Sequence, residues 1–309
     1  MCKYTLVIPT YNAGPNFKFL CDSIMAQTLN LDLVLIIDSS SSDETAKIAC
    51  AAGFDLHVID KNLFDHGGTR NIGIEVAHEG IIIFITQDVV FVDNTCLEKL
   101  VASFNDNSVA VAYGRQLPHD DATFFARELR KNNYPPESAI VSIKDKKRLG
   151  FRTFFCSNSF SAYRVSALNS IGKFKNNLLF GEDAYATALM LLKGYKKYYN
   201  SFACVKHSHN YSIFDEFKRY FDVGVFHKTE SWMIKEYGSP ISEGQNYVKN
   251  ELIFLFKQRL FFLVFSSIIR NTCKLIGYKL GTYHNLLPFF IIQHCTMNFS
   301  WWIKQKGAR

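Results

Sequence analysis

The chain has 309 residues, of which 48% are hydrophobic and 20% are charged, and its formal net charge is +7. This length allows one large core, or one core with a smaller appendage, and the sequence has no low-complexity tract or internal repeat. The eight cysteines stand singly, without a CxxC pair, which argues against a zinc knuckle or a disulfide framework and for a reducing compartment.

Strands and helices alternate through the first two-thirds of the sequence. The opening residues turn polar too soon for a signal peptide and read as a first strand, so we expect a cytoplasmic protein. The predicted strands are 4–9, 31–38, 55–60, 80–88 and 109–117, and the predicted helices are 17–25, 69–77 and 96–104, with one more after Glu44. Near-continuous apolar strands separated by helices predict a Rossmann-like α/β fold with a mixed, mainly parallel sheet flanked by helices.

Polar side chains follow four of these strands at the point where each strand ends. The four clusters are Pro9, Thr10, Tyr11 and Asn12; Asp38 with four serines and Asp43; FDHGGTRN at 64–71; and Thr86, Gln87 and Asp88. Because ligands of such sheets bind at the carboxyl ends of the strands, we expect these clusters to surround one site. A helix cap would explain one carboxylate at a strand end, but not four successive polar clusters.

The order of these motifs resembles the family 2 glycosyltransferases, which have the GT-A fold. It runs PTYN, an Asp after the second strand, an Arg–Asn pair, an Asp after the most hydrophobic strand, and then Glu182–Asp183. The segments FDHGGTRN, TQD and HSHNYS resemble more narrowly the bacterial rhamnosyltransferases that use dTDP-L-rhamnose. The resemblance covers about residues 3–235. It implies an inverting enzyme that moves a sugar from a nucleotide diphosphate to a hydroxyl of a lipid-linked oligosaccharide, in the synthesis of an O-antigen-like polysaccharide.

The nucleotide-sugar donor would meet several of these residues. By the resemblance, Asp38 accepts a hydrogen bond from N3–H of a pyrimidine; a cap for the next helix is the other explanation of this side chain. A glycine allows the backbone to approach phosphates, and Arg70 offers them a two-pronged donor, unless it forms a surface ion pair. The predicted donor-binding residues are Pro9, Thr10, Tyr11, Asn12, Asp38, His66, Gly67, Arg70, Asn71, Gln87 and Asn158, and a structural role for His66 stays open.

A divalent metal ion is expected at Asp88, which stands where the DxD metal motif of the family ends. Thr86 replaces the first acid of that motif, so a further protein ligand is needed. His207 and His209 would point to the same face of a strand, and the resemblance implies that one histidine here contacts the metal; we favour His207. Mg²⁺ or Mn²⁺ would fit, and histidine favours Mn²⁺. A structural role for both histidines is the alternative.

Glu182 and Asp183 are the candidate catalytic acids. Inversion needs one base, opposite the leaving diphosphate, to take the proton of the acceptor hydroxyl. We assign this role to Asp183, and we expect Glu182 to position the acceptor or the backbone. Two acids also favour the N-terminus of a helix, which is the purely structural explanation.

The C-terminal part differs from the rest in charge and composition. We expect a glycosyltransferase domain at 1–237 and a helical region at 238–309, joined by a hinge at 238–244. From Glu251 onward eight Lys or Arg stand against one acid, which accounts for the whole net charge. Basic residues beside runs such as LFFLVF (260–265) favour binding to an anionic membrane surface, here the inner face of the cell membrane. Packing on the core or on a second subunit is the alternative, which leaves a homo-oligomer open, and the scattered charges make nucleic acid a weaker partner.

Two other functions stay open. The enzyme could transfer another hexose from a UDP-sugar, because donor choice depends on few residues. The missing first acid of the DxD motif would also suit a non-catalytic, nucleotide-sugar-binding subunit of an assembly complex. The joint presence of Asp88, Glu182, Asp183 and His207 argues against such a loss of catalysis.

Overall fold

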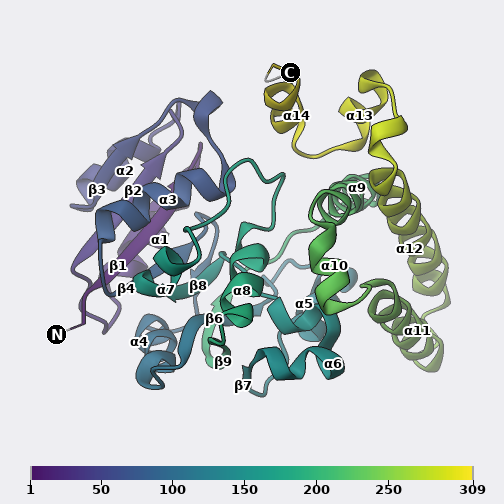
Figure 1. The fold of residues 1–309 in the computed structure, drawn as a ribbon, viewed down its shortest axis with the longest axis horizontal. Helices are drawn as coiled ribbons and strands as arrows, with labels where there is room; N and C mark the ends of the chain where they lie inside the picture. The colour runs from purple at the N-terminus through teal and green to yellow at the C-terminus, as the bar shows by residue number, and fades with distance from the viewer. Residues whose placement is uncertain (1, 308–309) are drawn as a thin grey trace. The chain divides into compact units, whose positions relative to one another are not determined.

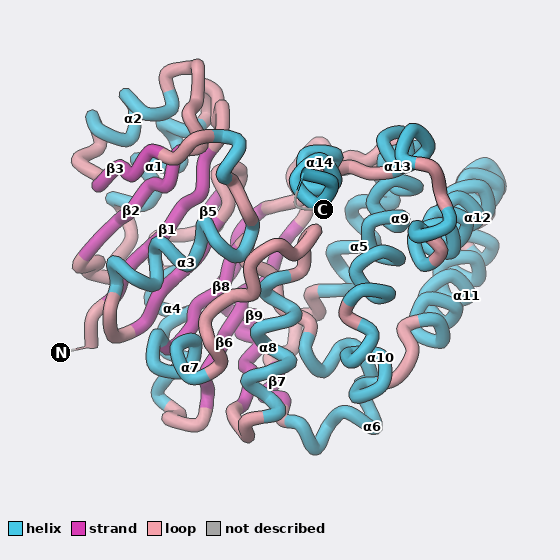
Figure 2. Tube along the Cα trace, turned by 45° about the horizontal axis from the view of Figure 1, so that its top comes forward, coloured by secondary structure: helices cyan, strands magenta, loops and turns pink. Residues whose placement is uncertain are grey.

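One sheet forms the framework of the protein in the computed structural model, which describes residues 2–307. Nine strands belong to it within that range: β1 (Tyr4–Thr10), β2 (Leu33–Asp38), β3 (Asp55–Val58), β4 (Ile81–Ile85), β5 (Val90–Phe91), β6 (Val109–Leu117), β7 (Ala139–Val141), β8 (Phe160–Arg164) and β9 (Lys196–Lys206). Their order is β3-β2-β1-β4-β8-β6-β9-β5, with β7 also beside β9. Strands β1 to β4 run parallel to one another, whereas β8 is antiparallel to both β4 and β6. Figure 2 shows the strands of the sheet in magenta.

Helices fill most of the connections between strands and the whole C-terminal part (Figure 1). Their bounds are α1 (Phe17–Met25), α2 (Thr45–Ala51), α3 (His66–Ala77), α4 (Cys96–Val101), α5 (Phe124–Asn133), α6 (Lys146–Leu149), α7 (Val165–Ser170), α8 (Glu182–Leu192), α9 (Ile213–Thr229), α10 (Ser231–Tyr237), α11 (Ile241–Lys257), α12 (Phe261–Thr282), α13 (Phe289–Cys295) and α14 (Phe299–Gly307). Within the described residues, no helix combines the length and apolar character that crossing a bilayer requires.

Both faces of the sheet are covered, because alternate residues of a strand point in opposite directions. On one face Leu6 and Ile8 of β1 belong to a core with apolar residues of α1, α2 and α4. On the other face Val7 of β1 belongs to a core with residues of α3, α7 and α8. Burial on both faces explains why the first strands read as near-continuous apolar runs. The predicted α/β fold is confirmed.

Strand β8 is absent from the predicted strands, although it lies in the middle of the sheet. Its sequence, FSAYR, has Ser161 and Ala162 between two aromatic residues and so lacks a run of large apolar side chains. Ser161 is nevertheless fully buried, because its hydroxyl donates to the Asn158 side chain at 2.8 Å. A satisfied hydrogen bond therefore replaces the apolar side chain that the prediction relied on.

The chain divides into two compact units. The first holds the sheet and comprises Met1–Asp145, Thr153–Leu178 and Glu182–Asn210; the second comprises Lys146–Arg152, Leu179–Gly181 and Tyr211–Arg309. This division differs from the expected boundary after residue 237, since α9 and α10 belong to the second unit. Helix α9 packs along α12, and a Cβ atom on Gly224, Gly277 or Gly281 would collide with a backbone carbonyl of the opposite helix.

Candidate active site

The loops after β1, β2 and β4 are tied together by side-chain hydrogen bonds. Gln87, after β4, accepts from the backbone N–H of Tyr11 at 2.9 Å and donates to its carbonyl at 3.2 Å. Asn12 has a left-handed backbone, with φ of 44°, and its Oδ1 accepts from the backbone N–H of Ser42 at 2.8 Å. The structure thus brings three of the four predicted polar clusters together at the carboxyl edge of the sheet.

Asp38 is buried at the end of β2 and organises the loop that follows. Its Oδ1 accepts from the hydroxyls of Thr10, at 2.8 Å, and Ser41, at 2.6 Å. Its Oδ2 accepts from the backbone N–H of Ser41 at 2.8 Å. Oδ2 therefore takes fewer hydrogen bonds than Oδ1, and it is the oxygen with capacity for a further donor. Recognition of a base by Asp38 stays a prediction.

Helix α3 starts beside the segment that precedes α8. The Asp65 side chain caps the helix by accepting from the backbone N–H of Gly68 at 2.6 Å. Gly67 lies so close to the Lys175 carbonyl that a Cβ atom would not fit. The Asn71 side chain bonds both the N–H and the carbonyl of Phe174, at 3.0 and 2.9 Å. The close approach that Gly67 allows in this structure is thus to the chain itself. A phosphate contact of Gly67 and a donor contact of Asn71 stay predictions.

Pro9 and His66 are both half-buried. Pro9 lies in β1, and His66 is the first residue of α3, where its ring packs edge-on against Phe64 with centroids 5.1 Å apart. The N-terminus of α3 and the strand ends lie in the same unit. Donor contacts of both residues stay predictions.

Arg70 and Glu182 form a buried ion pair, with Nη1 and Oε1 3.2 Å apart and each side chain 6% exposed. Arg70 Nη1 also donates to the His66 carbonyl at 2.9 Å. Among the described residues no atom accepts a hydrogen bond from Arg70 Nε. The structure therefore pairs Arg70 with a catalytic candidate, in place of the surface ion pair that the sequence left open.

Asn158 holds both acids of the Glu182–Asp183 pair. Its side-chain nitrogen donates to Glu182 Oε1 at 2.9 Å, and its backbone N–H donates to Asp183 Oδ2 at 3.0 Å. The Tyr163 hydroxyl donates to Asn158 Oδ1 at 2.8 Å and fixes the amide in this orientation. In the structure Asn158 supports the two acids through these hydrogen bonds, and its contact with the donor stays a prediction.

The surroundings of the two acids shift their pKa values in opposite directions. Burial alone would raise the pKa of Glu182, but the charges of Arg70 and His66 and the hydrogen bond from Asn158 together hold the pKa below its usual range. Burial and the negative charge of Glu182 raise the pKa of Asp183. Asp183 is half-buried, whereas Glu182 is buried. Of the pair, Asp183 is the acid that a reacting group could reach, and its raised pKa makes it the stronger base.

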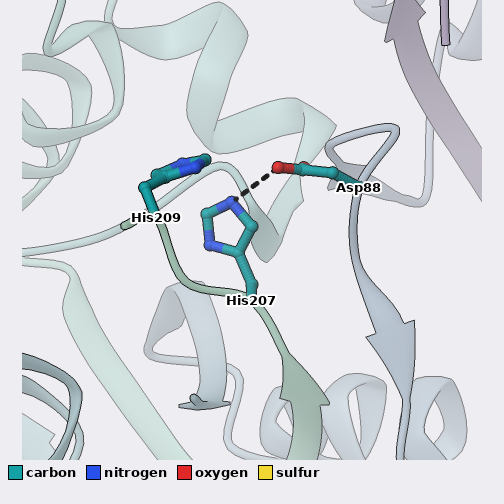
Figure 3. A group of neighbouring side chains, drawn as sticks. All are labelled: Asp88, His207 and His209. Atoms are coloured by element: carbon teal, nitrogen blue, oxygen red, sulfur yellow. Dashed lines mark ion pairs between the residues drawn. The ribbon is translucent and has the colours of Figure 1, made fainter. Parts of the chain in front are cut away.

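Asp88, His207 and His209 form a cluster that could hold a metal ion (Figure 3). Their ligand atoms all lie within 4.8 Å of one another, and His207 Nε2 is 3.4 Å from Asp88 Oδ2. The imidazole rings of the two histidines lie edge to face, with centroids 4.7 Å apart. A carboxylate that stays ionised beside two imidazoles suits a divalent cation.

Two residues of the site were missed by the sequence analysis. Lys61, after β3, donates to the Tyr11 hydroxyl and lies 4.2 Å from the centroid of the Tyr11 ring. Gln116, near the end of β6, lies 2.9 Å from Nδ1 of His207. A lysine in an exposed turn carries no distinctive signal, but a glutamine inside an otherwise apolar strand could have drawn attention to Gln116.

Comparison with known proteins places the chain in a family. The model of glycosyl transferase family 2 matches residues 5–172. The chain is 40% identical over 304 residues to the O-antigen chain rhamnosyltransferase WbaN of Salmonella anatum, covering 98% of this chain and 96% of that protein. It is 39% identical over 302 residues to the O-antigen chain rhamnosyltransferase RfbN of Salmonella typhimurium, covering 97% and 96%.

Solved structures share the fold at low sequence identity. A mannosyltransferase from Pyrobaculum calidifontis, solved with GDP-mannose and Mn²⁺, has a TM-score of 0.62 at 12% identity, and the match covers 90% of this chain and 87% of that one. Residues 1–349 of TarS from S. aureus have a TM-score of 0.53 at 17% identity, with 92% of each chain covered. The predicted GT-A fold and enzyme class are confirmed: the chain belongs to glycosyl transferase family 2 and is a glycosyltransferase.

Proposed function

We propose that this enzyme transfers L-rhamnose from dTDP-L-rhamnose, with inversion, to a hydroxyl of a lipid-linked oligosaccharide during O-antigen-like polysaccharide synthesis. The assignment of the sugar and of the pathway rests on the similarity, over nearly the full length, to two relatives that are named O-antigen chain rhamnosyltransferases. The site supports the chemistry, since it combines a reachable base with a cluster of metal-ligating side chains.

Asp183 acts as the base. Its carboxylate takes the proton of the acceptor hydroxyl while the acceptor oxygen forms a bond to C1 of the sugar, and the bond from C1 to the diphosphate oxygen breaks on the opposite side. Asn158 and the backbone N–H of Ala184, which donates to Asp183 Oδ1 at 2.7 Å, hold this carboxylate in place. Glu182 stays ionised and keeps Arg70 in position.

The Asp88, His207 and His209 cluster would hold Mn²⁺ in preference to Mg²⁺, because imidazole nitrogens suit Mn²⁺ better than Mg²⁺. The bound ion would supply positive charge to the diphosphate as it leaves. Asp88 would contribute its ionised carboxylate, and His207 its Nε2 nitrogen. The Tyr11 ring, which Lys61 contacts, lies at the same edge of the sheet and could stack on the thymine base.

Purified protein with Mn²⁺ would be offered dTDP-L-rhamnose, dTDP-glucose, UDP-glucose and UDP-N-acetylglucosamine, with donor hydrolysis and binding as readouts. Hydrolysis selective for dTDP-L-rhamnose would support the proposal, and selectivity for a UDP-sugar would overturn the donor. Asp183→Asn should remove turnover but leave donor binding unchanged, while Asp22→Asn, a charge removed from the exposed surface of α1, should change neither. Binding of none of the donors would favour a non-catalytic subunit.

The site of action that we propose is the inner face of the cell membrane, reached through α12. Seven large apolar residues along this helix are exposed: Phe261, Phe262, Phe265, Ile268, Ile269, Leu275 and Ile276. Their helical spacing places them in one stripe, which we call the α12 stripe. Lys257 and Arg259, both exposed, precede it directly. Apolar side chains beside cations suit an anionic bilayer, which is the occupant that we propose for the α12 stripe.

Sedimentation with vesicles of phosphatidylglycerol and phosphatidylcholine would test this surface in the full-length chain. Replacing Phe262, 83% exposed, and Phe265, 64% exposed, by aspartate should release the protein from the vesicles without unfolding it. The matched control is Phe202→Asp, which changes a phenylalanine of β9 that is 70% exposed. Equal binding by the α12 double variant and the control would reject the membrane surface, and concentration-dependent self-association lost only in the double variant would favour a second copy of the chain.

A further inference from the structure

We propose that Gln116 and Arg130 are positioning residues that fix the His207 ring with its Nε2 lone pair directed toward Asp88, ready for a divalent cation. This inference rests on the proposed function in one respect, namely the metal site. Gln116 lies on β6 and is 1% exposed, and Arg130 reaches it from α5. All three residues belong to the unit that contains the sheet.

The orientation of the Gln116 amide follows from its neighbours. Arg130 Nη1 lies 2.7 Å from Oε1 of Gln116. A guanidinium group has only hydrogen-bond donors, so the atom that faces it must be the amide oxygen. The amide nitrogen then points to Ser157 and donates to its hydroxyl at 3.1 Å. Arg130 therefore prevents the amide from turning over.

The same oxygen determines which nitrogen of His207 carries hydrogen. Gln116 Oε1 lies 2.9 Å from His207 Nδ1, and an amide oxygen only accepts hydrogen bonds. Nδ1 must therefore carry the hydrogen, and in a neutral imidazole Nε2 is left with its lone pair. Figure 3 shows that Nε2 faces Asp88, at 3.4 Å from Oδ2. Lone pairs on two facing atoms repel each other unless a cation lies between them, so the arrangement suits a metal ion.

A structural role alone would make a different prediction. If the three residues merely connected β6, α5 and the segment after β9, their replacement would lower the stability of the protein. It would not change which nitrogen of His207 is protonated. The protonated nitrogen is therefore the readout that separates the two explanations, and it can be measured without metal.

The first experiment is nitrogen NMR of protein labelled with ¹⁵N-histidine, free of metal, at about pH 8.5, where an ordinary imidazole is neutral. His207 would be assigned from the signal that His207→Asn removes. We expect hydrogen on Nδ1 in the wild type and in Gln116→Glu, which keeps an oxygen facing the ring. Gln116→Leu and Arg130→Met should shift hydrogen toward Nε2, since the first lacks the acceptor and the second frees the amide to turn.

The second experiment is titration with MnCl₂, in which electron paramagnetic resonance measures free Mn²⁺. Gln116→Leu should bind Mn²⁺ about 10- to 100-fold more weakly than the wild type, as is usual when the partner of a ligating histidine is lost. Arg130→Met should also weaken binding. The matched control is Arg127→Met, one turn earlier on α5. The Arg127 guanidinium donates to the Ala122 carbonyl, so this variant should bind Mn²⁺ like the wild type.

Several outcomes would overturn the inference. A wild-type ring with hydrogen on Nε2 would do so, as would unchanged hydrogen position and Mn²⁺ affinity in both Gln116→Leu and Arg130→Met. If Gln116→Leu does not fold, Arg130→Met decides the question, because it leaves the buried glutamine in place. A wild type that has hydrogen on Nδ1 but binds no Mn²⁺ would reject the metal site of the proposed function, and it would be recognised as that failure because the ring is read without metal.

Discussion

At the scale of single residues, two neighbouring carboxyl groups of the site have different pKa shifts because their surroundings differ. Glu182 faces Arg70 and the side-chain amide of Asn158, whereas Asp183 faces backbone N–H groups and the charge of Glu182. Their pKa values consequently shift in opposite directions. Divergent pKa values of adjacent acids are a common way to assign one as the proton acceptor and the other as a fixed charge.

Removal of Arg70 should expose how much Glu182 depends on it. Arg70→Met should lower the free energy of unfolding by about 3–5 kcal/mol, because it leaves an uncompensated charge in a buried place. The double variant Arg70→Met/Glu182→Gln should regain part of this loss. Urea unfolding measures both. As a control, Lys18→Met removes an exposed pair with Asp22 and should cost at most about 0.5 kcal/mol; an equal loss from Arg70→Met would contradict the argument.

The pH dependence of turnover should report Asp183. As the base it must be deprotonated, so kcat/KM should fall when the pH is lowered through its raised pKa. The acid limb of the profile should therefore lie above the ordinary aspartate value of about 3.9. A pH–rate profile with saturating Mn²⁺ measures this limb. An acid limb at the ordinary aspartate value would show that Asp183 is not the proton acceptor.

At the scale of elements, α9 and α12 meet through glycines on both helices. Gly281→Ala would place a Cβ against the Phe221 carbonyl, where a rigid backbone cannot give way. We expect a loss of about 1–3 kcal/mol in the free energy of unfolding and faster proteolysis of residues 211–307. Gly244→Ala in α11 is the matched control, since its Cβ would meet no atom within 4 Å and alanine favours a helix. Similar stability of the two variants would contradict close packing of α9 on α12.

The sequence predicted those elements whose hydrophobic period is clear. The strands near β1, β2 and β4 and the helices near α1 and α3 were recognised from apolar runs and from spacing. Strand β8 was missed because the hydroxyl of buried Ser161 is satisfied by a hydrogen bond. The packing of α9 on α12 was not foreseen because the glycines of α12 give no signal until α9 lies beside them. In the site, Asp88, His207 and His209 were found by motif, whereas Gln116 depends on a contact between β6 and a distant segment.

At the scale of the whole molecule, the net charge is concentrated in the last fifth of the sequence. Eight Lys or Arg and a single acid follow residue 250, whereas the rest of the chain is balanced. The α12 stripe lies in this same part of the chain. With this distribution, the basic, apolar C-terminal part would bind an anionic surface. The sheet that carries the candidate active site would then not be needed for membrane binding.

Salt should therefore weaken membrane binding in a graded way. Screening acts over roughly 8 Å at physiological ionic strength, so added NaCl should reduce the contribution of Lys257 and Arg259 but not that of the apolar stripe. Lys257→Glu/Arg259→Glu should bind anionic vesicles more weakly and show a smaller salt dependence than the wild type. Lys3→Glu/Lys18→Glu, on the surface of the other unit, is the control. If membrane binding does not change with NaCl, the basic residues make no electrostatic contribution to it.

The two hydrogen bonds between the Gln87 side chain and the Tyr11 backbone resemble one further step of the pairing of β1 with β4. Its amide offers one acceptor and one donor to the backbone of Tyr11, as a neighbouring strand would. The amide hydrogen of Tyr11 should then exchange slowly with deuterium even before any substrate arrives. The loop that we expect to bind the nucleotide would already be ordered in the free protein, so binding would cost little conformational entropy. Only a side chain of similar length that carries both a hydrogen-bond donor and an acceptor could replace Gln87.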